Sequence, residues 1–225
     1  MRIGIVSTQN NGKTTLVEAF KKFWPKYISP TATYRDIIKE KNLSINQNSN
    51  LETQTILRDS LVDQAINNAS ITHRIDDCTI LDNLVYTLWL GGKDKIDDVQ
   101  FITDSINICR ETLKLYDIIF WLPLNPDIII EGGKADRDID PSFREEIDAI
   151  FQAVYEGYVE QDGIVFDVKD QPPMIPLQGD LDEKLNIIRE YLNEEGDLIE
   201  TEKSIFQTLE DTYDQVSLEK ELLRK

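Results

Sequence analysis

The apolar positions of this chain alternate between two spacings, one typical of buried strands and one typical of helices. The run from Ile3 to Val6 has the strand spacing, and apolar residues recur at helical spacing from Leu16 to Phe23. Farther along, the pattern predicts strands at 26–29, 71–75, 117–122 and 163–168, and helices at 33–41, 51–69, 84–90, 97–115, 142–158 and 180–192. Strands that alternate with helices predict a three-layer α/β fold with a central parallel sheet.

A phosphate-binding loop is predicted between the first strand and the first helix. The sequence S-T-Q-N-N-G-K-T fits G-x-x-x-x-G-K-[S/T], except that Ser7 replaces the first glycine. Backbone N–H groups at a helix N-terminus attract phosphates, Lys13 supplies a positive charge for the β and γ phosphates, and the Thr14 hydroxyl can bind Mg²⁺. The residues expected to bind ATP are Asn10, Asn11, Gly12, Lys13, Thr14 and Thr15. This is the P-loop NTPase pattern.

A carboxylate that faces this loop is expected from the stretch D-D-C-T-I-L-D-N-L-V-Y, residues 76–86. Such a carboxylate can order Mg²⁺ or take a proton from an attacking hydroxyl. If the strand is 71–75, Asp77 has this role, and if the strand is 79–81, Asp82 has it. Asp82 can also serve as the cap of a helix that starts at Asn83. Burial of Asp76 together with Asp77 requires a compensating cation.

A lid is predicted at about residues 126–144, where Gly132 and Gly133 accompany charged residues that include Arg137 and Arg144. A segment that carries arginines can close over a phosphoryl group as negative charge spreads over its oxygens. We expect both arginines to be catalytic.

The charge balance restricts the partners. The chain of 225 residues has 24 basic and 42 acidic residues, a formal net charge of −18, which argues against binding of duplex DNA or anionic membranes. It has no apolar run of about 18 residues and no secretory signal, and its two cysteines lack metal-ligand spacing. We therefore expect a cytoplasmic protein.

The composition becomes strongly acidic beyond residue 195. Residues 196–225 carry a sparse helical stripe of apolar side chains. We predict a catalytic domain at 1–195 and an acidic helical extension at 196–225 that docks on the domain or mediates contact with a second copy or a protein partner.

Taken together, four stretches resemble the P-loop kinase family typified by the ribosylnicotinamide kinase domain of NadR-type proteins, with kinship to nucleoside and nucleotide kinases. They are G-K-T-T-L, then Y-I-S-P-T-A-T-Y-R-D-I followed by L-E-T-Q, then D-x-T-x-x-D-N-L-V-Y, and finally Asp136-Arg137 with D-P-S-F-R-E-E-I-D. The resemblance implies that Lys13 and Thr14 hold ATP and Mg²⁺, that Asp77 is the base or a magnesium ligand, and that Arg137 and Arg144 belong to the lid. It also implies an acceptor site that includes Arg35, Gln54, Asp82 and Tyr86.

The sequence departs from this family at a second place besides Ser7. Cys78 follows Asp77 where these kinases usually have an arginine, so that positive charge is missing or comes from elsewhere, for instance from Arg74.

The expected function is ATP- and Mg²⁺-dependent phosphoryl transfer to a small nucleoside, nucleotide or related hydroxyl acceptor. Two alternatives stay open. One is a P-loop ATPase or nucleotide switch that acts on a protein partner, and the other is a kinase of modified bases in DNA, which the net charge of −18 disfavours.

Overall fold

The computed structural model describes residues 1–30, 34–125, 140–166 and 171–199. In these residues four strands form one sheet in the order β2-β1-β3-β4, and every pair is parallel. The strands are β1 (Arg2–Val6), β2 (Arg74–Asp76), β3 (Ile118–Trp121) and β4 (Met174–Pro176). The connections contain α1 (Lys13–Phe23), α2 (Tyr34–Glu40), the 3-10 helix η1 (Asn46–Asn48), α3 (Leu51–Asn67), α4 (Ile80–Gly92), α5 (Val99–Leu113) and α6 (Pro141–Glu160), and α7 (Leu181–Tyr191) follows the last strand.

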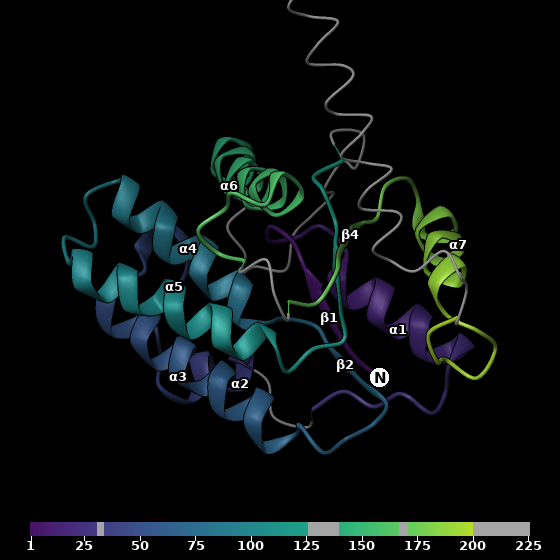
Figure 1. The fold of residues 1–225 in the computed structure, drawn as a ribbon. Helices are drawn as coiled ribbons and strands as arrows, with labels where there is room; N and C mark the ends of the chain where they lie inside the picture. Colours follow the sequence, from purple (N-terminus) through teal and green to yellow (C-terminus); the bar gives the residue numbers. More distant parts are fainter. Residues whose placement is uncertain (31–33, 126–139, 167–170, 200–225) are drawn as a thin grey trace, which may run out of the picture.

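The sheet lies between two helical layers, as predicted. Side chains that alternate along β3 divide between two cores: Ile118 and Phe120 join the core formed with α1 and α7, whereas Ile119 and Trp121 join the core formed with α3 to α6. Figure 1 shows α1 and α7 on one side of the strands and α3 to α6 on the other. Strands buried on both faces explain the continuous apolar run of β3.

The fourth strand is not where the sequence analysis placed it. Residues 163–166 of the predicted strand 163–168 form no strand, and 167–168 lie outside the described residues. Val165 and Phe166 are buried instead against the core of α3 to α6. The observed β4 includes a proline, which is tolerated because β4 is an edge strand and pairs on one side only.

Two further expectations need correction. The predicted strand at 26–29 contributes one isolated bridge, between Ile28 and Arg74. Helix α4 begins at Ile80 rather than near residue 83, because Thr79 caps it and Asp82 completes a capping box with Thr79.

The described beginning of the C-terminal extension packs on the domain. Leu192 and Leu198 form an antiparallel bridge, and the Tyr27 hydroxyl donates to the Gly196 carbonyl at 2.6 Å. Trp24 Nε1 donates to the Asn193 carbonyl at 2.9 Å. Residues 200–225, which hold most of the predicted acidic helix, lie outside the described residues.

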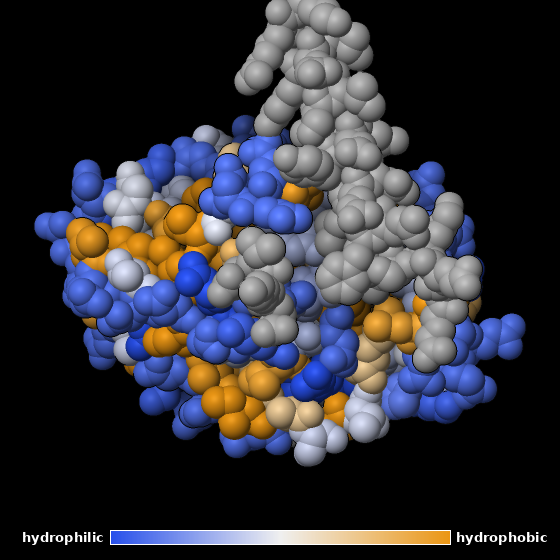
Figure 2. Space-filling view, in the orientation of Figure 1, coloured by the Kyte–Doolittle hydropathy of each residue, from blue (hydrophilic) through white to orange (hydrophobic). Residues whose placement is uncertain are grey.

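The visible surface is largely hydrophilic, with apolar residues interspersed (Figure 2). Large exposed apolar side chains come from different elements, such as Phe23 in α1, Ile66 in α3 and Val99 in α5. Among the described helices, none combines the length and the hydropathy needed to cross a bilayer.

Candidate active site

The predicted phosphate loop occupies residues 7–12, between the carboxyl end of β1 and the first turn of α1. Gly12 is the N-cap of α1 with φ of 82°, and Asn10 also has a left-handed φ, 57°. No side chain caps α1, whereas side chains cap each of α3 to α7. The first N–H groups of α1 are therefore available to an anion at the positive end of the helix dipole.

The buried side chain of Asn11 attaches the loop to the segment that follows β3. Asn11 is 2% exposed, and its Nδ2 donates to the carbonyls of Leu122 at 2.8 Å and Pro123 at 3.0 Å. Its side chain therefore supports the loop. Ser7 is wholly buried and is not among the residues with positive φ. The serine in place of glycine thus causes no backbone strain.

Lys13 is held at the centre of the site by two acceptors. Its Nζ donates to the Ser7 carbonyl and to Asp82 Oδ1, both at 2.7 Å. Burial alone would lower the pKa of Lys13, but the Asp82 carboxylate and the neighbouring Cys78, Tyr34 and Tyr86 together outweigh this effect and raise the pKa. Lys13 is therefore a permanent positive charge beside the loop.

The two candidate carboxylates have different surroundings. Asp82, in the first turn of α4, accepts from Lys13 with Oδ1 and from the Thr79 N–H with Oδ2. Asp77 directly follows β2, and its Oδ2 accepts from the Thr14 hydroxyl at 2.7 Å. Asp77 Oδ1 is buried and has no hydrogen-bond partner in the described part of the chain. Of the two, Asp77 has the oxygen that is free to accept another proton or ligand.

Arg35 supplies positive charge beside Asp77. One of its terminal nitrogens lies 3.2 Å from the Thr14 hydroxyl and 3.4 Å from Asp77 Oδ2. Arg74 cannot have this role, because it is wholly buried and paired with Asp76 at 3.2 Å. The charges of the adjacent Asp76 and Asp77 are thus compensated by separate arginines. Burial raises the pKa of the neighbouring Cys78 thiol, so Cys78 stays uncharged.

Thr14 and Asp77 fit the requirements of Mg²⁺. The ion prefers oxygen ligands and is usually held by one or two carboxylates together with phosphate oxygens and water. The hydroxyl and the carboxylate are in contact, and Asp77 keeps one oxygen unpaired among the described residues. Thr15, next along α1, is exposed.

Gln54 and Tyr86, both expected in the acceptor site, have different surroundings, and only Tyr86 contacts the phosphate loop. Gln54 is 3% exposed: its Nε2 donates to Ser49 Oγ at 2.7 Å, and its Oε1 accepts from Asn83 Nδ2 at 2.8 Å. This network joins α3 to α4. The Tyr86 hydroxyl donates to Gln9 Oε1 at 2.7 Å, which brings Tyr86 to the phosphate loop.

Arg144 lies in the first turns of α6 and contacts the same loop. Its Nε donates to the Gln9 carbonyl at 3.2 Å, and a terminal nitrogen is buried without a partner among the described residues. Burial lowers the pKa of Arg144. Arg137 and residues 126–139 of the predicted lid lie outside the described residues.

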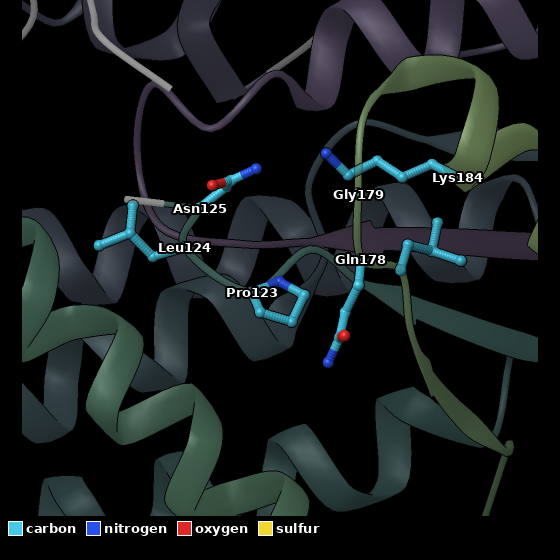
Figure 3. Close-up of a pocket in the computed structure, with 7 residues that line it drawn as sticks. Pro123, Leu124, Asn125, Gln178, Gly179 and Lys184 are labelled. Carbon is cyan, nitrogen blue, oxygen red and sulfur yellow. The ribbon is translucent and has the colours of Figure 1, made fainter. Parts of the chain in front are cut away.

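Sequence reasoning missed a pocket at the carboxyl ends of β3 and β4. Its volume is about 260 Å³, and residues 123–125, residues 177–179 and Lys184 line it (Figure 3). Pro123 connects it to the phosphate loop, because the Pro123 carbonyl accepts from Asn11. Ligands of open α/β sheets bind at this edge, so the position of the pocket was foreseeable once β4 was known.

Comparison with solved structures finds nucleoside and nucleotide kinases. A deoxyadenosine kinase from M. mycoides superposes with a TM-score of 0.56 and 15% identity over 84% of this chain and 97% of that chain. The fold is that of the P-loop kinases. A NadR protein in complex with NAD and AMP-PNP superposes with a TM-score of 0.57 and 14% sequence identity. The match covers 88% of this chain and 50% of the NadR chain. A thymidylate kinase from Candida albicans superposes with a TM-score of 0.57 and 15% sequence identity. The match covers 88% of this chain and 94% of the thymidylate kinase chain.

No protein-family model matches the sequence, and no curated protein matches it significantly. The P-loop kinase fold therefore rests on the structure, and the chemistry rests on the site described above.

Proposed function

We propose that this chain is a Mg²⁺-dependent kinase that transfers the γ-phosphoryl group of a nucleoside triphosphate to a hydroxyl of a small nucleoside or nucleotide. The observation that carries the proposal is the meeting of three side chains at the carboxyl ends of β1 and β2: Thr14, Arg35 and Asp77, with contacts of 2.7 to 3.4 Å. Lys13, which precedes Thr14, is held beside them by Asp82. They lie beside a helix N-terminus that no side chain caps.

Each residue has a role that follows from its surroundings. The backbone N–H groups at the start of α1 and the Lys13 ammonium hold the phosphates. Thr14 and Asp77 would hold Mg²⁺, which, when bound, neutralises charge on the phosphate oxygens. Arg35 lies on the side of Asp77 toward α2, where it orients the acceptor.

Asp77 is the proposed base, because its Oδ1 has no partner among the described residues. It accepts the proton of the acceptor hydroxyl as the hydroxyl oxygen bonds to the γ-phosphorus. The bond from that phosphorus to the bridging oxygen of the β-phosphate breaks, and the nucleoside diphosphate leaves. Asp82 is a weaker candidate, since both of its oxygens already accept hydrogen bonds.

The pocket beyond β3 and β4 is suited to the base of the donor nucleotide. It adjoins the phosphate loop through Asn11, and Pro123 and Leu124 supply apolar surface on which a planar base can stack. The acceptor then lies on the other side of the loop, near Asp77 and Arg35.

The test is ADP release from ATP and MgCl₂, measured with each common nucleoside and nucleoside monophosphate. We expect slow release alone and faster release with one class of acceptor. Asp77→Asn should lower kcat by about 10²- to 10⁴-fold, the usual contribution of a general base, and weaken binding of the nucleotide much less than Lys13→Met does. Asp63→Asn, an exposed carboxylate of α3, is the matched control. Lys13→Met should abolish nucleotide binding.

Two results would contradict the proposal. If no small acceptor accelerates ADP release but a protein does, the chain is a nucleotide switch. If Asp77→Asn retains full turnover with the best acceptor, the base is a different group.

A further inference from the structure

Lys184 breaks the pattern of its own helix. The buried residues of α7 are Lys184, Leu185 and Ile188, so a lysine occupies the apolar stripe that faces the core. It is 6% exposed, and its ammonium has no hydrogen bond or ion pair within the described ranges 1–30, 34–125, 140–166 and 171–199. Burial lowers the pKa of Lys184, an effect that the carboxylates of Asp180 and Glu183 partly oppose.

A lysine on the buried stripe of a helix is unusual, because lysine side chains are almost never buried unless their charge is used or paired. The ammonium of Lys184 points into the pocket beyond β3 and β4, toward the Asn125 amide (Figure 3). The cation therefore faces the space that the proposed function assigns to the base of the nucleotide.

The chemistry of the pocket indicates which base it accepts. Lysine offers only donors, so it recognises an edge rich in acceptors. Guanine presents two adjacent acceptors, O6 and N7, whereas adenine presents the N7 acceptor beside an amino donor. The apolar surface of Pro123 and Leu124 would contact the ring faces of both purines equally and therefore does not discriminate between them.

Resting on the proposed function, we infer that Lys184 recognises the O6/N7 edge of a purine and makes guanine nucleotides preferred over adenine nucleotides at this site. Lys184 is a specificity-determining residue, and the ligand class is a guanine or hypoxanthine nucleoside triphosphate. Inosine triphosphate is the sharper probe, because it has O6 and N7 and lacks the 2-amino group of guanine.

The experiment is a binding titration of the full chain with GTP, ITP, ATP and inorganic tripolyphosphate in the presence of Mg²⁺. We expect GTP and ITP to bind about tenfold more tightly than ATP, the usual discrimination from a good contact to a base edge. Lys184→Met should remove this preference and leave the affinity for tripolyphosphate unchanged. Lys22→Met, an exposed lysine of α1, is the control and should retain it.

Thermal unfolding without nucleotide checks that the variant folds. Lys184→Met should be at least as stable as the parent, because Lys184 makes no ion pair with a described residue and methionine suits the buried stripe of α7. Equal weakening of all four ligands by Lys184→Met would show that Lys184 contacts phosphate and would overturn the inference. So would a parent chain that binds ATP and GTP equally. Failure of all four ligands to bind the parent would instead contradict the proposed function.

Discussion

Replacement of Asp82 by asparagine tests how the phosphate loop is held before a nucleotide arrives. The side chains of Lys13 and Asp82 are 10% and 4% exposed, and their charged atoms lie 2.7 Å apart. Removal of one partner from a buried ion pair usually costs 3–5 kcal/mol, since the other charge stays buried without compensation. Asparagine keeps an oxygen that can accept from the Thr79 N–H, so the start of α4 should persist. We expect Asp82→Asn to lower the free energy of unfolding by about 3 kcal/mol.

The same change should strengthen nucleotide binding. In the parent chain the phosphates compete with the Asp82 carboxylate for Lys13, and in the variant the phosphates become the main counter-charge of that lysine. The nucleotide complex should therefore lose less stability than the free protein does. By the thermodynamic cycle, a difference of about 1.4 kcal/mol between these losses appears as a tenfold gain in affinity.

Urea unfolding with and without nucleotide, combined with a nucleotide titration at fixed ionic strength, measures both quantities. Glu183→Gln is the matched control for stability, because Glu183 has the same position in the capping box of α7 and is not ion-paired with a lysine in the described structure. It should cost about 1 kcal/mol or less. The reasoning is refuted if Asp82→Asn is as stable as the parent, or if it binds nucleotide more weakly.

Three further predictions follow from the site and its surroundings. Gly12→Ala should cost about 1–2 kcal/mol in urea unfolding from backbone strain alone, since φ is +82° and no atom lies within 4 Å of an added Cβ; Gly92→Ala, equally unobstructed, should cost nothing. Arg144→Met should lower kcat more than nucleotide affinity in the ADP-release assay, and an unchanged kcat would mean that Arg144 only supports the loop. Burial raises the pKa of Asp76 to about 6 from 3.8, so the folded state binds its proton more tightly. The stability contributed by this proton is present below about pH 4 and is lost as the pH rises through 6, by up to about 3 kcal/mol. In urea unfolding at several pH values, Asp76→Asn should flatten this slope.

Much of the fold was predictable because its signals are local. The apolar runs of β1 and β3 and the helical spacing of α3, α5, α6 and α7 depend on neighbours in sequence, and the predicted elements match the observed ones to within a few residues. The candidate phosphate loop was equally visible, since phosphate binding at a helix N-terminus needs particular residue types in a row. The capping box that starts α4 was also present as T-x-x-D and was overlooked.

Other features depended on contacts between distant segments. Residues 163–166 have a stronger apolar pattern than 174–176, yet only the latter pair with β3, because the chain returns to the sheet edge there and Ile119 donates to the Pro173 carbonyl. A short edge strand pairs with one neighbouring strand only, so its sequence need not show a long run of apolar residues.

The choice between Asp77 and Asp82 was likewise a tertiary decision. Pairing of Gly4 with Asp76 ends β2 one residue before Asp77 and so places Asp77 against Thr14. The fold of α4 places Asp82 against Lys13. The residue types in the sequence determined the prediction that this chain binds phosphate. The register of the parallel strands and the start of α4 decided which carboxylate is left with a free oxygen, because only the tertiary structure brings residues more than sixty positions apart into contact.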